Sequence, residues 1–121
     1  MSEVDLTCNR GDTTEWELVV SKNGIAVDLT GAKIWMTGRR NRGGSVVFQR
    51  TSDALGGITI DPDQVVNPGV AVIKLATSST SGLASETVTL FYDIQVKTLT
   101  DLWTVNYGDL VVTPDATTET E

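Results

Sequence analysis

Apolar side chains alternate with polar ones through a stretch in the second half of the chain. The apolar residues are Val88, Leu90, Tyr92, Ile94 and Val96, and the residues between them are polar except for Phe91. Successive side chains of a β-strand point to opposite faces of a sheet, so this spacing predicts one apolar face and one wetter face. A helix would distribute the same residues around its circumference. The pattern therefore predicts a long, half-buried strand in an antiparallel sheet.

The rest of the chain repeats this pattern in shorter stretches. Further strands are expected at residues 4–8, 15–20, 25–29, 32–37, 46–50, 58–60, 70–75 and 102–113. Asn23 and Gly24 predict a hairpin turn, because both residue types adopt positive φ readily. Residues 38–44 and 61–69 are polar and predict loops. About eight or nine short strands with frequent turns predict an all-β fold, a single antiparallel β-sandwich.

Some local features can also be predicted from the pattern. In residues 70–75 the inward-facing side chains are expected to be Ala71, Ile73 and Leu75. Leu83 is expected to cover the edge of the core from a short helical turn, and Gly108 is expected to allow a bulge in the last strand. We expect one domain over residues 1–113, followed by an acidic, flexible tail at residues 114–121.

Composition narrows the classes of protein that the chain can belong to. Its 121 residues suffice for one domain with a core, and 40% hydrophobic with 21% charged residues is ordinary globular usage. The net charge of −7 argues against a protein that coats nucleic acid or docks on anionic membranes. The amino terminus lacks the basic and apolar stretches of a signal peptide, so we expect synthesis in the cytoplasm.

The residues that usually carry enzyme chemistry are scarce. Histidine is absent, which excludes histidine-dependent triads and removes the commonest metal ligand. The single cysteine, Cys8, alternates with Val4 and Leu6, which predicts a small buried hydrophobe and not a reactive thiol. No pair of carboxylates lies in an identifiable cleft pattern of the kind that glycoside hydrolysis needs. We therefore expect no enzyme activity, no cofactor and no metal site.

Two motifs that contain aspartate resemble known binding motifs of other proteins, but each has a simpler explanation in this chain. Arg10-Gly11-Asp12 is an integrin-binding tripeptide in other contexts, but here it precedes a strand and Asp12 can bond turn amides. Asp61-Pro62-Asp63, with Asp53, supplies oxygen atoms for Ca²⁺ but lacks the further donors of a calcium loop. We interpret both motifs as solvated turns.

The candidate partner contacts are basic and aromatic. Arg39, Arg40 and Arg42 stand close together in an otherwise acidic chain, and arginine binds carboxylates or phosphates with two hydrogen bonds. A solvated hairpin tip is the simpler alternative. Trp35 and Trp103 depart from the apolar parity of their strands, so either could line an interface or a sugar-stacking surface. Burial on the other face of the sheet is the alternative for both.

Several short motifs also follow one another in a distinctive order. They are Arg10-Gly11-Asp12-Thr13, Val27-Asp28-Leu29-Thr30-Gly31-Ala32, Ile34-Trp35-Met36, Gly57-Ile58-Thr59-Ile60, Gly69-Val70-Ala71-Val72, Tyr92-Asp93-Ile94-Gln95-Val96 and Leu110-Val111-Val112-Thr113-Pro114. This progression resembles a family of small immunoglobulin-like modules in tailed-phage virions, including the amino-terminal domain of phage baseplate upper proteins. The resemblance covers nearly the whole chain and implies an immunoglobulin-like form of the sandwich.

The resemblance implies a non-enzymatic structural component of a phage virion. Such a protein acts by contacts with other virion proteins, in a symmetric assembly, as a tail, baseplate, connector or capsid accessory part. Nucleic acid, membrane and small-molecule partners are not expected. One alternative is a carbohydrate-binding module that uses exposed tryptophans, Trp35 or Trp103, as stacking platforms. Another is a bacterial surface adhesion domain, against which the missing signal peptide counts.

Overall fold

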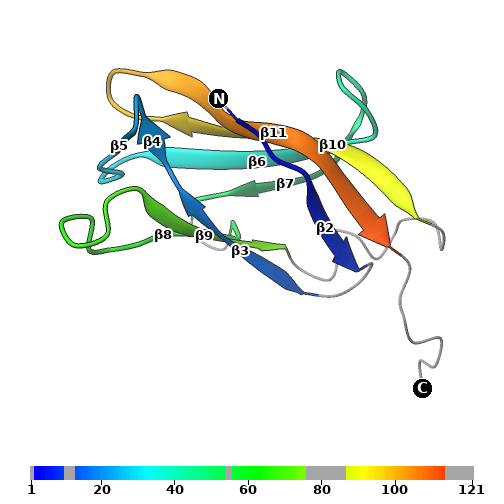
Figure 1. Ribbon diagram of the computed structural model, residues 1–121, viewed down its shortest axis with the longest axis horizontal. Helices are drawn as coiled ribbons and strands as arrows, with labels where there is room; N and C mark the ends of the chain where they lie inside the picture. The colour runs from blue at the N-terminus through cyan, green and yellow to red at the C-terminus, as the bar shows by residue number, and fades with distance from the viewer. Residues whose placement is uncertain (1, 10–12, 54–55, 76–86, 114–121) are drawn as a thin grey trace.

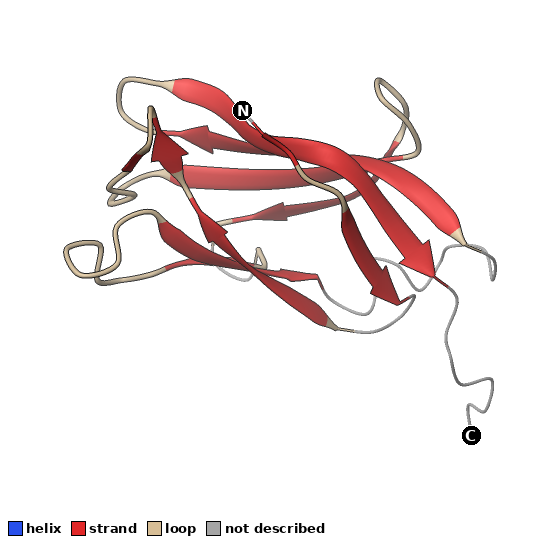
Figure 2. Ribbon diagram, viewed as in Figure 1, coloured by secondary structure: helices blue, strands red, loops and turns tan. Residues whose placement is uncertain are grey.

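The computed structural model describes residues 2–9, 13–53, 56–75 and 87–113, and these residues form strands and turns without a helix (Figure 1; Figure 2). The first strands are β1 (Ser2–Glu3), β2 (Leu6–Asn9), β3 (Thr14–Val19), β4 (Ser21–Lys22), β5 (Ile25–Ala26) and β6 (Lys33–Arg39). The later strands are β7 (Val46–Thr51), β8 (Ile58–Ile60), β9 (Val70–Leu75), β10 (Val88–Lys97) and β11 (Leu102–Thr113). The expectation of an all-β fold is confirmed.

The strands form three sheets. A six-stranded sheet has the order β1-β11-β10-β6-β7, with β2 also paired to β11. A three-stranded sheet has the order β3-β9-β8, and β4 pairs with β5 in a two-stranded ribbon. Figure 1 shows the larger sheet curling over the smaller one, so that the long strands β10 and β11 form the back of the curl.

The larger sheet is mixed, which corrects the expectation of purely antiparallel strands. β10 pairs antiparallel with both β6 and β11, whereas β1 and β2 run parallel to β11. The parallel register joins Leu6 to Leu110 and Cys8 to Val112, residues that are more than a hundred positions apart. Alternation of side chains predicts a strand but not its partner or direction, because both kinds of pairing present the same two faces.

The core lies between the two main sheets. The larger sheet contributes Leu90, Tyr92, Ile94 and Val96 from β10, together with inward residues of β6 and β11. The smaller sheet contributes Leu18, Ile58, Ala71, Ile73 and Leu75. The predicted inward faces of residues 70–75 and 88–96 are thus confirmed, and Cys8 is buried as expected. Removal of this apolar surface from water is the main force that holds the two sheets together.

Tyr92 ties the first residues of the chain to the core. Its ring is fully buried, and its hydroxyl donates a hydrogen bond to the backbone carbonyl of Val4. Burial, and then the negative charge of Asp5, raises the pKa of Tyr92 to about 12. Opposite Tyr92, Gly108 approaches the same Val4 carbonyl so closely that a Cβ atom would overlap it. The segment between β1 and β2 is therefore fitted against these two residues.

Several local predictions are confirmed and others are corrected. Asn23 and Gly24 have φ angles of 54° and 78°, as a tight hairpin turn between β4 and β5 requires. Gly38 and Arg39 continue β6 instead of opening the predicted loop, because they pair with β7 and β10. Residues 76–86, including Leu83, and the tail at residues 114–121 lie outside the described part of the chain.

The bulge in β11 lies at Val105 and not at Gly108. Ile94 of β10 pairs with Asn106, and the next residue, Gln95, pairs with Thr104, so Val105 is the extra residue. Val105 is buried and adds an apolar side chain to the core at this point. The predicted position of the bulge was wrong. Gly108 pairs regularly with Tyr92, and its missing side chain allows the Val4 carbonyl to approach closely.

Candidate functional site

The arginines predicted as partner contacts come from the hairpin between β6 and β7, but the structure gives them separate environments. Arg39 is half-buried, and its Nη1 donates a hydrogen bond to the Gly44 carbonyl at 3.1 Å. The Arg40 amide donates to the Ser45 carbonyl at 3.0 Å, and its side chain is exposed. Arg39 therefore stabilises its own hairpin and Arg40 faces solvent. Arg42 has a third environment.

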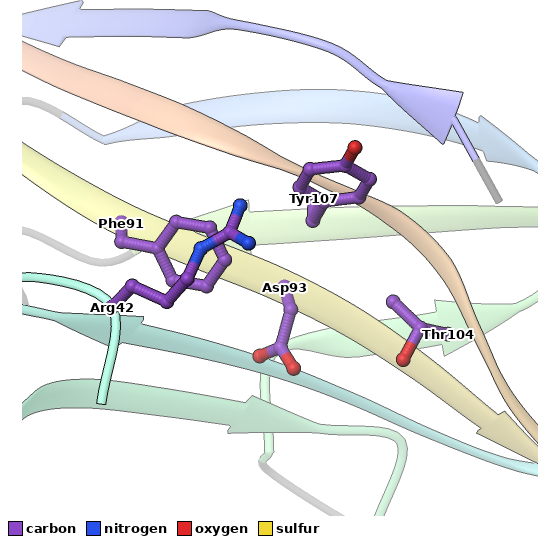
Figure 3. Close-up of a pocket in the computed structure, with 5 residues that line it drawn as sticks. All are labelled: Arg42, Phe91, Asp93, Thr104 and Tyr107. Atoms are coloured by element: carbon purple, nitrogen blue, oxygen red, sulfur yellow. The ribbon is translucent and has the colours of Figure 1, made fainter.

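Arg42 folds back onto the outer face of the larger sheet. Its guanidinium carbon lies 4.7 Å from the ring centroid of Phe91 on β10 and 5.4 Å from that of Tyr107 on β11. The two rings are 6.4 Å apart and tilted by 44°, so the cation lies over both (Figure 3). Cation–π contacts of this kind contribute about 0.5–1 kcal/mol each at exposed sites. They hold the hairpin tip against the sheet.

These three residues line a pocket with Asp93 and Thr104, which we call the Arg42 pocket (Figure 3). Its volume is about 230 Å³. Asp93 follows Phe91 by two positions on β10 and pairs with Tyr107, which brings an acceptor next to the aromatic pair. Thr104 lies opposite Gln95, one pair further along the same face. The pocket therefore combines two aromatic rings, one cation, one carboxylate and hydroxyl groups.

The sequence contained a partial signal for this pocket. Phe91 was the one apolar residue on the polar side of the alternating strand, and Arg42 belonged to the arginine group. Asp93, Thr104 and Tyr107 were not predicted as site residues. These residues lie close together because of the β10–β11 register, which the bulge at Val105 shifts by one residue.

Trp35 and Trp103 lie on opposite faces of the larger sheet. Trp35 alternates with buried Ile34 and Met36, so it points to the outer face, where Lys33 Nζ lies 5.2 Å from its ring centroid. Trp103 packs against the core, with Lys22 Nζ at 4.9 Å from its ring centroid. The two tryptophans therefore do not form one stacking platform.

A second surface lies at the end of the molecule opposite the Arg42 hairpin (Figure 1). Three loops meet there, and each carries exposed aliphatic side chains. These are Ile25 of the β4–β5 hairpin, Val65 and Val66 of the β8–β9 loop, and Leu99 and Leu102 around the β10–β11 turn. Their exposure ranges from 61% at Leu102 to complete exposure at Leu99. We call this surface the aliphatic end.

Polar contacts join two loops of the aliphatic end to each other and tie the third to the β5–β6 connection. Lys22 forms an ion pair of 2.8 Å with Asp101, which joins the β4–β5 hairpin to the β10–β11 turn. Gln64 is a buried polar residue in the β8–β9 loop, and its Oε1 accepts hydrogen bonds from the amides of Leu29 and Gly69, each at 2.9 Å. Its Nε2 donates to the Asp61 carbonyl at 2.8 Å. Sequence reasoning missed Gln64, since its role depends partly on Leu29, which is 35 positions away.

The acidic residues near this end already have hydrogen-bond or ion-pair partners within the chain. Asp28 Oδ1 accepts hydrogen bonds from the Thr30 hydroxyl at 2.7 Å and the Thr30 amide at 2.9 Å, and these lower the pKa of Asp28. Asp61 accepts from the Asp63 amide at 2.8 Å, and Asp53 pairs with Lys33 at 3.0 Å. Asp53, Asp61 and Asp63 were the residues considered for calcium. In the described ranges, no group of three or more acidic, cysteine or histidine residues is arranged to hold a metal ion.

Two other sequence observations can be compared with the structure. Arg10-Gly11-Asp12 lies outside the described residues. Within the described residues, no helix is long and apolar enough to cross a membrane. Comparison of the chain with known protein families and with curated proteins finds no match.

Proposed function

We propose that this chain is a non-enzymatic structural protein of a tailed-phage virion, an immunoglobulin-like β-sandwich that acts by contacts with neighbouring proteins. Its place is in the tail, the baseplate, a connector or the capsid surface, after synthesis in the host cytoplasm. The order of motifs along the chain motivates this proposal, and the all-β fold with its core between two sheets is compatible with it. The observation that supports protein contact most directly is the aliphatic end.

Exposed aliphatic residues are ordinary when they are scattered, but here they are gathered on three loops at one end of the molecule. Full burial of a Val, Leu or Ile side chain contributes about 1.5–3 kcal/mol. Five such residues would contribute roughly 8–15 kcal/mol, which is similar to the cost of about 4–15 kcal/mol for immobilising a partner. A single contact is therefore weak, and repeated contacts in a symmetric assembly supply the remaining stability.

The charge around the aliphatic end favours a different protein as the neighbour. Asp61 and Asp63 lie on the β8–β9 loop and Asp28 on the β5–β6 connection that this loop contacts, while Lys22 is already paired with Asp101. Two copies that met through this end would bring like charges together, which costs free energy as the surfaces are desolvated. The partner that fits is a virion protein with an apolar patch surrounded by lysine or arginine.

Mass spectrometry and electron microscopy of particles purified from a lysate of the producing host test this function. We expect the chain in the particles at a copy number that matches their symmetry, with the aliphatic end against a different protein. Absence of the chain from intact particles would overturn the proposal. A particle in which the aliphatic end faces solvent would overturn the assignment of the contact surface.

A further inference from the structure

We propose that the Arg42 pocket binds one pyranose ring of an uncharged glycan. This inference goes beyond the structural function, and it departs from the expectation that no small molecule is bound. It rests on the five lining residues Arg42, Phe91, Asp93, Thr104 and Tyr107 and not on the aliphatic end. The two surfaces lie on different parts of the molecule, so each proposal can fail without the other.

The charges that line the pocket favour a neutral ligand. Arg42 brings one positive charge and Asp93 brings one negative charge. An anion would meet the Asp93 carboxylate, and a cation would compete with Arg42, which already lies over the aromatic rings. A neutral molecule that both donates and accepts hydrogen bonds meets neither penalty. Sugar hydroxyl groups have this property.

The hydrogen-bonding groups and rings match the two kinds of surface that a pyranose has. Arg42 donates, Asp93 accepts, and the hydroxyls of Thr104 and Tyr107 do both. Because Arg42 lies over the two rings, the C–H face of a sugar would pack against the parts of Phe91 and Tyr107 that line the pocket beside the guanidinium. At about 230 Å³ the pocket is smaller than the about 300–1,000 Å³ typical of drug-sized ligands. It therefore suits one ring of a chain and not a large ligand.

The same face of the sheet offers room for further sugar units. Trp35 of β6 pairs with Gln95, which in turn pairs with Thr104 of the pocket. Neighbouring strands lie about 4.8 Å apart, so the backbone of Trp35 is about 10 Å from that of Thr104. Trp35 thus belongs to the same outer face as the Arg42 pocket, whereas Trp103 packs against the core. A glycan that leaves the pocket across Gln95 would reach Trp35.

Binding to an array of neutral and acidic glycans, followed by calorimetric titration with the methyl pyranosides of the hits, tests this inference. We expect binding of neutral glycans, and at least a tenfold loss of affinity for both Asp93→Asn and Tyr107→Ala. Asp93→Asn retains the size of the side chain, so it separates binding from folding. Thr89→Ala is the matched control, since Thr89 is exposed on the same strand but outside the pocket.

Three results would overturn the inference. One is the absence of any neutral glycan hit with the folded wild-type chain. The second is binding that both Asp93→Asn and Tyr107→Ala leave unchanged. The third is a preference for acidic glycans whose affinity falls steeply as salt is added, because screening weakens contacts between charges but not those of a neutral sugar.

Discussion

We expect replacement of Gln64 by alanine to destabilise the fold more than substitutions in loops usually do. Gln64 accepts hydrogen bonds from the amides of Leu29 and Gly69 and donates one to the Asp61 carbonyl. In Gln64→Ala the two amides lose their acceptor while Leu29 and Gly69 remain buried. An unsatisfied buried polar group costs about 1–3 kcal/mol, so two amides would cost about 2–6 kcal/mol. Because water can reach part of this end, we expect a loss of about 2–4 kcal/mol in the free energy of unfolding.

Urea denaturation followed by tryptophan fluorescence measures this loss. With a slope of about 2 kcal/mol per M, the unfolding midpoint of Gln64→Ala should fall by about 1–2 M relative to the wild type. Val65→Ala is the matched control, because the neighbouring Val65 side chain is 92% exposed and its midpoint should stay nearly unchanged. A Gln64→Ala midpoint equal to that of the control would refute the role assigned to Gln64.

Gln64→Glu provides an independent check through pH. At neutral pH the glutamate keeps acceptors for the two amides but faces the Asp61 carbonyl without a donor. Protonation restores the donor, so the folded state raises the pKa of this glutamate above its unfolded value of about 4.3. The stabilising proton is fully bound below the unfolded pKa and is lost as pH rises through the folded pKa. The stability gap to the wild type should therefore narrow as the solution is acidified; a constant gap would contradict this reasoning.

Three further predictions concern other parts of the molecule. The pKa of Tyr92 is raised to about 12, so the stability that the neutral hydroxyl contributes is complete below about pH 10 and is lost between about pH 10 and 12. Alkaline denaturation of Tyr92→Phe should lack this pH-dependent loss of stability. Identical denaturation curves for Tyr92→Phe and the wild type would contradict the role assigned to the hydroxyl. Gly108→Ala should lower the thermal midpoint, because a Cβ atom would overlap the Val4 carbonyl; an unchanged midpoint would show that β11 can move away. The double variant Ile25→Asp with Leu99→Asp should melt like the wild type but fail to enter particles, and normal incorporation would exclude the aliphatic end as the contact.

Much of the strand pattern could be predicted from the sequence because alternation is a local property. The inward faces of β9 and β10 and the Asn23-Gly24 turn were predicted correctly for this reason. A strand was expected over residues 25–29, but β5 covers only Ile25–Ala26, and Ile25 is exposed whereas Leu29 is buried. The parity of a two-residue strand carries too little information to show which side faces the core.

The candidate sites were predicted less well, because they join residues from distant strands. Arg42 and Phe91 each stood out in the sequence, but nothing local indicated that the hairpin folds back over the ring. Tyr107 and Asp93 face each other only because Val105 is bulged out of the regular pairing. Without the bulge the pairing would be displaced by one residue, and Tyr107 and Asp93 would lie on opposite faces of the sheet.

The alternation from Val88 to Val96 by itself determined that this chain contains a long strand with one apolar face, and Leu90, Tyr92, Ile94 and Val96 are buried accordingly. Tertiary structure alone decided that β1 and β2 lie parallel to β11, that Phe91 shares a pocket with Tyr107, and that three aliphatic loops meet at one end. The physical reason is that alternation between neighbouring residues decides which side chains can face the core. Strand partners, direction and register depend instead on contacts between segments far apart in the chain.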